Sequence, residues 1–492
     1  MALDKVLGTE TEFGITILNQ RGFNPVTASS AVVNGYAGTR SKIRWSFEEE
    51  SPGADLRGIG VRDASGIDVD SGLVNTVLTN GARLYVDHAH PEYSTPESTD
   101  PWSGALYDKA GEQVMVRAVA AAQDLLGPNE RMVVHKNNSD GKGNSYGAHE
   151  NYLVARATPF GDLVRHLTPF FITRQIFTGA GKVGAENGRP DVGFQITQRA
   201  DFFEEKVGLE TTLKRPIINT RDEPHADASL YRRLHVIIGD ANLSEVQTFL
   251  KLGTTALVLD AIESGALPDP VGLADPVREV WAVSHDPTLG HLLETVDGHR
   301  LTALDVQWRL FEHVERHARS VGASTIWMRV LEEWEQVLAD LGQDPATTAD
   351  RLDWTAKLRL LDAYRDRDQL GWSSAKLRLL DLQYHDVDPT RSLYRRLVDR
   401  GEIRRLFRDE EVNDAVSRPP TDTRAYFRGE CVRRYPEAVV AANWDSLVFD
   451  IGEETLKRVP MMDPLRGTRR LVADLLDASP DAATMIRALG RE

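Results

Sequence analysis

The order of the predicted elements constrains the fold of this chain more than any other feature. Short segments of alternating polar and apolar residues predict strands, and they lie mostly early, at residues 5–18, 74–86, 132–134 and 151–155. Helical spacing of apolar residues comes mostly later, at residues 105–126, 244–265, 302–341 and 353–383. Strands that come first and helices that follow favour an α+β fold.

Local signals indicate where several of these elements begin and end. Asn80-Gly81 is the pair favoured in tight two-residue turns, so we expect residues 74–86 to form a hairpin. Ser244 predicts the N-cap of a helix, and Gly265 predicts its C-terminal stop. The dipeptide Gly127-Pro128 predicts the end of the helix that precedes it.

Two stretches indicate how the chain is divided. Residues 42–73 combine acidic residues, glycines and proline with weak periodicity, which predicts a long inserted loop or lid. Pro419-Pro420 predicts a boundary. We therefore expect a catalytic domain at residues 1–418 and a small C-terminal domain at 419–492.

Composition excludes several classes of protein. The chain has no run of roughly 18 apolar residues that would predict a membrane-spanning helix, and its start lacks the pattern of a secretory signal. Its single cysteine, Cys431, excludes an internal disulfide and a thiolate zinc cage. A net charge of -16 argues against a general nucleic-acid binder. We expect a cytoplasmic enzyme that engages neither membranes nor nucleic acid.

Glu10-Thr11-Glu12 lies in the first predicted strand. Residues two apart on a strand share a face, so both carboxylates are expected to point the same way. Two like charges side by side repel each other unless a cation lies between them, and Mg²⁺ prefers oxygen ligands. An exposed acidic strand face is the commoner explanation of such a pair when it occurs alone.

A second acidic group follows the predicted hairpin, in the segment Asp87-His-Ala-His-Pro-Glu92. Asp87 fits a nucleophile, a base or a residue that caps a turn, and Glu92 fits a metal ligand. Glu97 lies just beyond them. The histidines at 88 and 90 suggest zinc, but an oxygen-rich site favours magnesium.

Two further segments carry candidate ligand groups. A glycine-rich turn at residues 141–147 runs into His149, which fits either a ligand or a packed structural histidine. The segment 218–235 contains Arg221, Arg233 and His235. Arginines grip phosphates in two-pronged fashion and His235 could complete a metal shell, although mixed charges more often form a solvated loop.

These groups occur in longer motifs with a recognisable order. Six segments closely resemble the Pup ligase/depupylase family: GTETEFG (8–14), TNGARLYVDHAHPEYS (79–94), NSYGAHENY (144–152), INTRDEPHADA (218–228), RRLHVIIGDANLSE (232–245) and TDTRAYFRGECVRR (421–434). The resemblance covers essentially the whole chain. It implies a glutamine synthetase-like curved antiparallel sheet that cradles metal ions and ATP, with packed helices and a small C-terminal domain.

The family has two branches. One ligates the small disordered modifier Pup to lysines through a γ-glutamyl phosphate. The other, Dop, deamidates the C-terminal glutamine of Pup and cleaves the isopeptide bond of pupylated proteins. The insertion at residues 44–58 resembles the loop of the Dop branch, so the resemblance favours a deamidase and depupylase. The alternatives are a Pup ligase, a small-molecule carboxylate–amine ligase, and an inactive protein that sequesters Pup.

The resemblance also implies roles for individual residues. Asp87 corresponds to the catalytic aspartate, which attacks the amide carbonyl or positions water or phosphate for that attack. The implied magnesium ligands are Glu10, Glu12, Glu92 and His235. The implied contacts to nucleotide phosphate or substrate are His149, Arg221 and Arg233. ATP and Mg²⁺ are the implied cofactors, and Pup and pupylated proteins the implied partners.

Overall fold

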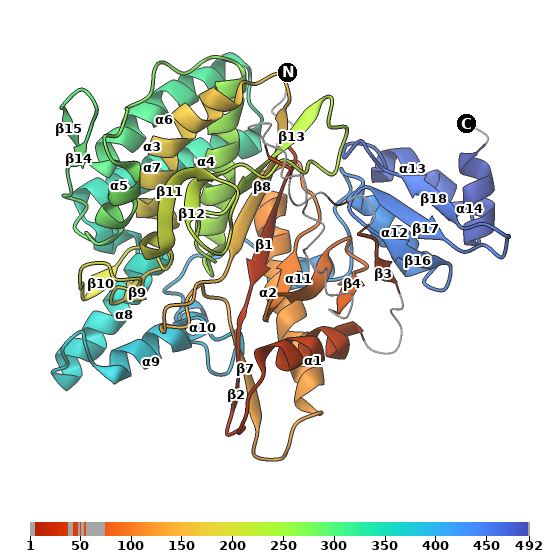
Figure 1. Ribbon diagram of the computed structural model, residues 1–492, viewed down its shortest axis with the longest axis horizontal. Coiled ribbons are helices and arrows are strands. Elements are labelled where there is room, and N and C mark those ends of the chain that lie inside the picture. The colour runs from red at the N-terminus through yellow and green to blue at the C-terminus, as the bar shows by residue number, and fades with distance from the viewer. Residues whose placement is uncertain (1–4, 38–42, 48–49, 51–53, 56–73, 491–492) are drawn as a thin grey trace.

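The computed structural model describes residues 5–37, 43–47, 50, 54–55 and 74–490. Figure 1 shows a central sheet with a helical half on one side and the C-terminal elements on the other. Most of the predicted loop at residues 42–73 lies outside the described residues. The predicted α+β class is confirmed, because helices and antiparallel strands build the fold together.

The central sheet has six strands in the order β13-β8-β1-β6-β5-β4, and every neighbouring pair is antiparallel. Its strands are β1 (Leu7–Glu12), β4 (Asn75–Val77), β5 (Arg83–Asp87), β6 (His90–Ser94), β8 (Ala148–Ala155) and β13 (Tyr231–Val236). β1 lies between β8 and β6, so its side chains meet those of both neighbours.

The predicted strand at residues 5–18 is two strands. β1 ends at Glu12, and β2 (Gly14–Leu18) leaves the central sheet to pair with β7 (Arg131–His135). A Cβ atom at Gly14 would lie 2.3 Å from the Tyr146 hydroxyl oxygen, so the chain passes too close to this ring for any larger residue. The alternation of polar and apolar residues at 5–18 does not indicate with which neighbouring strand each part of this segment pairs.

The predicted hairpin is present as β4 and β5, but the prediction of a two-residue turn is wrong. The Leu78 amide donates to the carbonyl of Ala82 at 2.8 Å, which closes a three-residue loop. Gly81 takes a left-handed conformation with φ of 82°. The side chain of Asn80 instead bonds outward, donating to Tyr93 Oη and to the Ala415 carbonyl.

One face of the central sheet packs on helices. Leu7, Tyr152 and Leu234 project from it into the largest apolar core, which helices α3 and α4 complete. The helices that flank the sheet are α1 (Pro25–Ala37), α2 (Pro101–Gln123), α3 (Phe160–Thr178) and α4 (Glu245–Glu263). The predicted cap is confirmed, since Ser244 accepts a hydrogen bond from the Gln247 amide.

The helical half follows in the sequence. Its elements are α5 (Pro276–Ser284), α6 (Ala303–Ser320), α7 (Thr325–Gln343), α8 (Asp353–Asp368), α9 (Ala375–Tyr384), α10 (Leu393–Asp399) and α11 (Asp409–Ala415). Shorter strands accompany it in separate two-stranded sheets: β9 (Lys182–Val183) with β10 (Phe194–Gln195), β11 (Phe203–Gly208) with β12 (Arg215–Asn219), and β14 (Leu293–Glu294) with β15 (Arg300–Leu301). Each long helical stretch predicted here is interrupted, the second at Gln369 in a left-handed conformation.

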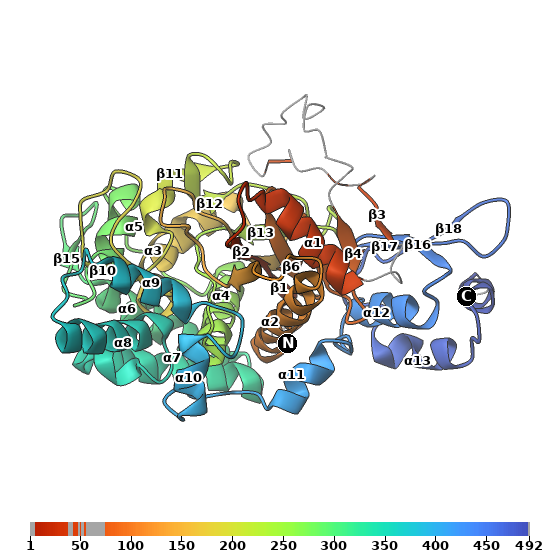
Figure 2. The ribbon, with the colours of Figure 1, turned by 90° about the horizontal axis from the view of Figure 1, so that it is seen from below.

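The C-terminal elements form a unit with its own apolar cluster. They are α12 (Ala425–Arg434), β16 (Val439–Ala442), β17 (Ser446–Phe449), β18 (Lys457–Pro460), α13 (Arg469–Asp477) and α14 (Ala482–Leu489). Strand β3 (Arg44–Trp45) adds to this sheet beside β16, far from it in the sequence (Figure 2). The boundary at residue 419 stays a prediction, but the unit also includes this earlier strand. No helix among the described residues is long and apolar enough to span a membrane.

Candidate active site

The uncovered face of the central sheet gathers the polar side chains. Glu10 lies opposite His149 on β8 and opposite Ser94 on β6, while Glu12 lies opposite Glu92. Directly paired residues in an antiparallel sheet share a face, so the register brings these side chains together. The prediction that both carboxylates of β1 share a face is confirmed.

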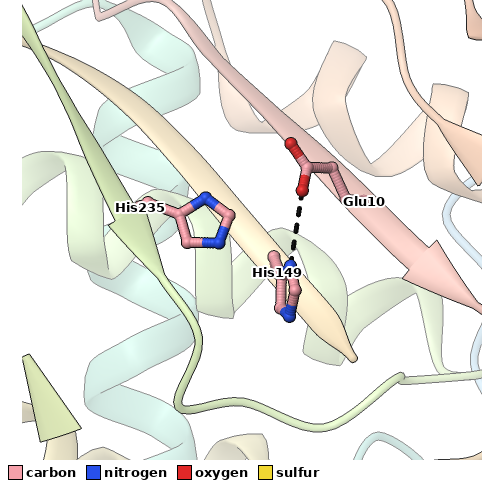
Figure 3. A group of neighbouring side chains, drawn as sticks. All are labelled: Glu10, His149 and His235. Atoms are coloured by element: carbon pink, nitrogen blue, oxygen red, sulfur yellow. Dashed lines mark hydrogen bonds and ion pairs between the residues drawn. The ribbon is translucent and has the colours of Figure 1, made fainter. Parts of the chain in front are cut away.

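The first group on this face is Glu10, His149 and His235, which we call the histidine cluster (Figure 3). Their candidate ligand atoms all lie within 4.8 Å of one another. His149 Nδ1 is 3.3 Å from Glu10 Oε2, and Asn151 Nδ2 donates to Glu10 Oε1 at 2.9 Å. Asn151 was not predicted as a site residue, although its position two residues after His149 puts it on the same face.

Charge in the histidine cluster is largely compensated. Burial alone would raise the pKa of Glu10, but the His149 hydrogen bond and the nearby His235 and Arg233 hold it well below its usual value. Burial and the charge of Arg233 lower the pKa of His235, which favours the neutral imidazole. Arg233 Nη1 lies 2.8 Å from Asn151 Oδ1, so the amide anchors the guanidinium as well.

The histidine cluster fits a metal ion by one specific observation. His235 Nε2 is buried and has no hydrogen-bond partner among the described residues. His235 Nδ1 lies 3.2 Å from Arg233 Nη1 and 3.3 Å from Asn151 Oδ1; the tautomer that donates to Asn151 leaves a lone pair on Nε2. A buried imidazole nitrogen beside a carboxylate suits a divalent cation.

The second group is Glu12, Asp87 and Glu92, the carboxylate cluster, whose ligand atoms also lie within 4.8 Å of one another. Glu92 is 2 % exposed. Burial raises its pKa well above the ordinary value, and the charges of Asp87 and Glu12 raise it further. Three mutually repelling carboxylates suit an oxygen-seeking cation such as Mg²⁺.

Two histidines orient the carboxylates from outside. His88, in a left-handed conformation with φ of 50°, lies with Nδ1 2.9 Å from Asp87 Oδ2. Burial would raise the pKa of Asp87, but the His88 hydrogen bond lowers it overall. His90 Nδ1 is 3.1 Å from Glu12 Oε2, and its ring stacks on Tyr146 with centroids 4.4 Å apart.

The glycine-rich turn closes against both clusters. The Glu12 amide donates to the carbonyl of Gly147 at 3.1 Å. A Cβ atom at Gly147 would lie 2.4 Å from His149 Nε2 and 2.7 Å from Glu12 Oε1. A glycine is therefore required here by the site's own side chains.

Three arginines surround these groups. Arg221 is near enough for its charge to lower the pKa of both Arg233 and His235. Arg199 and Arg215 were not predicted; both bond to Ser145, Arg199 Nε to the hydroxyl and Arg215 Nη2 to the carbonyl. Burial and the charge of Arg215 lower the pKa of Arg199 to about 9. Their surrounding sequence carries no motif, so only the fold brings them to Glu12, whose charge acts on both.

A pocket adjoins the histidine cluster where the sheet meets the C-terminal unit. Its lining includes Gly8, Glu10, His225, Arg233, Arg424 and Trp444. Residues of the central sheet and of the C-terminal unit therefore line the same space. The structure thus brings every predicted site residue on β1, β5, β6, β8 and β13 to one face, with Arg221 beside it.

Known proteins resemble this chain along nearly its whole length. A family model described as Pup-ligase protein matches residues 5–448. A protein of Acidothermus cellulolyticus named depupylase is 53% identical, with 99% of each chain covered. A Pup deamidase/depupylase of Mycolicibacterium smegmatis is 49% identical over 99% of this chain and 100% of its own. A Pup–protein ligase of an Arthrobacter species is 41% identical over 82% of this chain and 90% of its own.

Two solved structures share the fold. The complex between Pup and its ligase PafA superimposes with a TM-score of 0.81 at 33% identity, covering 96% of this chain and 92% of that one. The ligase PafA in complex with ADP gives a TM-score of 0.74 at 37% identity, covering 82% and 89%.

Proposed function

Because the chain belongs to the Pup-ligase family of proteins, we propose that it deamidates the C-terminal glutamine of Pup and cleaves the isopeptide bond between Pup and substrate lysines. The observation that carries this proposal is full-length similarity to proteins named for these activities. The ligase relative is less similar and leaves nearly a fifth of this chain unmatched. A cytoplasmic location is part of the proposal and suits a chain with one buried cysteine.

The carboxylate cluster is proposed to act on the scissile amide. Hydrolysis places the hydroxyl of water on the carbonyl carbon, which becomes the glutamate carboxyl. The nitrogen leaves with the proton, as ammonia in deamidation or as the lysine amine in depupylation. In this proposal Asp87 acts at the carbonyl carbon, as the attacking carboxylate or as the group that holds the attacking water.

Magnesium is proposed to be held by Glu12 and Glu92 in one cluster and by Glu10 and His235 in the other. The repulsion among the carboxylates and the unpartnered His235 Nε2 support this assignment. Bound magnesium would supply positive charge against which an amide or phosphate oxygen is polarised. His88 and His90 would keep the carboxylates oriented towards it.

ATP is proposed as the nucleotide, held by Arg221, Arg233 and His149, of which Arg233 lines the pocket beside the histidine cluster. The related ligase in complex with ADP supports a nucleotide in this fold. In this proposal ATP completes the site rather than being consumed in each turnover. Arginine groups near Glu10 would then meet phosphate oxygens in two-pronged contacts.

Mass spectrometry of Pup ending in glutamine, incubated with this protein, Mg²⁺ and ATP, tests the proposal. We expect a mass gain corresponding to glutamine becoming glutamate, with less than one ADP formed per conversion, and the release of free lysine side chains from a Pup conjugate. Absence of both reactions in the wild-type protein would overturn the proposal. Single turnover in H₂¹⁸O adds mechanistic detail, because label recovered in Asp87 would identify its carboxylate as the attacking group.

Pup ligation is the second candidate, because both solved relatives are ligases. A ligase would instead convert the glutamate form of Pup and a lysine acceptor into a conjugate, with one ADP formed for each bond. The same reaction mixtures, run with glutamate-ending Pup and an acceptor protein, distinguish the two activities by the ratio of ADP to product.

A further inference from the structure

Two buried arginines at helix α12 of the C-terminal unit share one carboxylate: Arg424 is the N-cap residue and Arg428 lies within the helix. Arg424 is 3 % exposed and Arg428 is fully buried. Arg424 Nε donates to Glu97 Oε1 at 2.8 Å, and Arg428 Nη1 donates to the same oxygen at 3.2 Å. Glu97 lies shortly after strand β6, so this pair of contacts ties the C-terminal unit to the central sheet.

The two arginines differ in what else they hold. Arg424 Nη1 donates to the carbonyl of His225 at 2.7 Å and to that of Met461 at 2.7 Å. Arg428 donates to the carbonyl of Gly81, in the hairpin loop at the far end of β5 from Asp87, and to that of Trp444 at 3.0 Å. Only Arg424 of the two is seen to reach the 223–225 segment.

The residue that Arg424 holds is in an unusual conformation. His225 has φ of 46°, in the left-handed region that costs non-glycine residues free energy. A conformation of this kind persists only where the surroundings impose it. The hydrogen bond from Arg424 to its carbonyl is one such restraint, and it comes from a different part of the chain.

The 223–225 segment leads directly to the histidine cluster. Glu223 Oε2 lies 3.7 Å from Arg233 Nη2 and 4.0 Å from His225 Nε2. Arg233 in turn contacts Asn151 at 2.8 Å and Glu10 at 3.5 Å. A continuous series of contacts therefore runs from α12 to the carboxylate of the histidine cluster.

We propose that Arg424 is a positioning residue for the reacting site: by holding the His225 carbonyl it fixes the 223–225 segment, and through Glu223 it sets the position of Arg233 beside Glu10. The C-terminal unit thereby controls how well the histidine cluster and its adjoining pocket bind their ligand. The identity of that ligand as MgATP rests on the proposed function; the positioning of Arg233 does not.

Arg424→Lys and Arg428→Lys form a matched pair for the test. Both keep the charge, both shorten a buried side chain on the same helix and both weaken the Glu97 contact. We expect similar falls in the melting temperature of the two variants. Titration calorimetry with ATP and Mg²⁺ should show a Kd raised roughly tenfold in Arg424→Lys, the size typical of outer-shell residues, and within twofold of wild type in Arg428→Lys.

Kinetics and crystallography complete the design. The KM for ATP in Pup deamidation should rise with the Kd in Arg424→Lys, while kcat changes little. A ligand-free crystal structure of that variant should show the 223–225 segment displaced and Arg233 moved away from Glu10. Unchanged affinity together with an unmoved Arg233 would overturn the proposal, and so would equal losses of affinity in both variants.

Failure of the proposed function can be distinguished from failure of the proposal about Arg424. If wild-type protein fails to act on Pup, the proposed function falls, while the crystal structure of Arg424→Lys still decides the role of Arg424. If Arg424→Lys does not fold, Glu223→Gln replaces it, because this change breaks the same series of contacts without touching α12. The same rise in Kd is then expected, and wild-type affinity in Glu223→Gln would contradict the proposal.

Discussion

Glu92 and Glu97 lie five residues apart, one in strand β6 and one just after it, yet their surroundings are opposite. Glu92 faces Asp87 and Glu12, and burial with these like charges raises its pKa well above the ordinary value. Glu97 meets Arg428 and Arg424, which outweigh burial and lower its pKa to about 2. Two glutamates close together in the sequence thus differ: the anionic form is destabilised at Glu92 and strongly stabilised at Glu97.

The contrast distinguishes a carboxylate that can bind a ligand from one that stabilises the fold. A buried carboxylate that opposes its neighbours costs free energy until a cation or proton arrives, which suits a group that must bind something. A buried carboxylate already satisfied by two arginines has no such capacity, but it joins two parts of the fold. Burial is common to both residues, so the sign of the neighbouring charge decides the role.

The largest expected effect comes from removing one of the charges around Glu92. Asp87→Asn keeps the shape of the side chain but removes the carboxylate proposed to act on the amide. We expect deamidation and depupylation to fall at least roughly 10³-fold, the upper range for a group that acts directly on the reacting atoms. Quantitative mass spectrometry of Pup measures this.

The thermal stability of metal-free Asp87→Asn should be slightly below that of wild type, because the interaction with His88 that lowers the pKa of Asp87 overall is lost. Asp422→Asn serves as a control, because this acid contacts Thr99 away from the clusters. Near-normal turnover by Asp87→Asn would show that Asp87 does not act on the amide.

Glu97→Gln should give the largest loss of stability. It leaves two buried arginines without their anion, and breaking a buried pair in this way costs about 3–5 kcal/mol. Urea unfolding followed by tryptophan fluorescence measures the loss, with Trp444 of the C-terminal unit among the reporters.

A matched control is Glu453→Gln, which breaks an exposed pair with Lys457 in the same unit and should cost only about 0–1 kcal/mol. Equal stability changes in the two variants would mean that Glu97 is not the anchor described above.

Glu92→Gln should change stability in the opposite direction. In metal-free protein at pH 8 it removes a buried carboxylate whose pKa is raised by burial and by the charges of Asp87 and Glu12, so we expect the variant to be more stable than wild type. Magnesium should stabilise the wild type, by about 2.7 kcal/mol at one hundred times its Kd, and should stabilise the variant much less. Melting curves with EDTA and with Mg²⁺ measure both effects. Destabilisation of the metal-free variant would contradict the contrast between the two glutamates.

The smallest expected effect is a pH dependence that belongs to Glu97 alone. Its pKa is about 2 in the folded protein, below the usual value of 4.5. The stability that it contributes is therefore complete above pH 4.5 and is lost as the pH falls towards 2.

The difference in unfolding free energy between wild type and Glu97→Gln should shrink by up to about 1.4 kcal/mol per pH unit over that interval. Denaturant unfolding at half-unit steps between pH 6 and pH 3.5 measures the upper part of this range. A difference that does not change with pH would assign the stabilisation to shape rather than to charge.

Local patterns in the sequence anticipated much of the fold. Alternation located β1, β4, β5 and the later part of β8 in the central sheet but missed β6 and β13, and Ser244 was identified as a helix cap because a cap depends only on its nearest residues. Patterns failed where a tertiary contact intervened. The strand at 5–18 is divided after Glu12, where β2 leaves the central sheet to pair with β7, and the hairpin turn is longer than predicted, with Asn80 bonded to Tyr93 and the Ala415 carbonyl.

The sequence predicted the charged site residues that lie in motifs. It missed the site residues that are neutral or that lie outside any motif. Glu10, Asp87 and His235 are ionisable residues within long motifs, whereas Asn151 lies in a motif but is neutral, and Arg199 lies in none of them. Their roles depend on which strand lies beside which. The predicted domain boundary at residue 419 stays a prediction, although β3 shows that an earlier segment contributes to the C-terminal sheet.

The sequence by itself determined the types of element, the shared face of Glu10 and Glu12, and the motifs that identify the family. Those properties follow from the period of a strand or from residues adjacent in the chain. Only the tertiary structure decided that Asp87 joins Glu12 and Glu92, that Glu97 pairs with Arg424 and Arg428, and that His235 Nε2 has no hydrogen-bond partner within the described part of the chain. Electrostatic and hydrogen-bond energies depend on distance in space, and the strand register that sets those distances is fixed by the packing of the whole sheet.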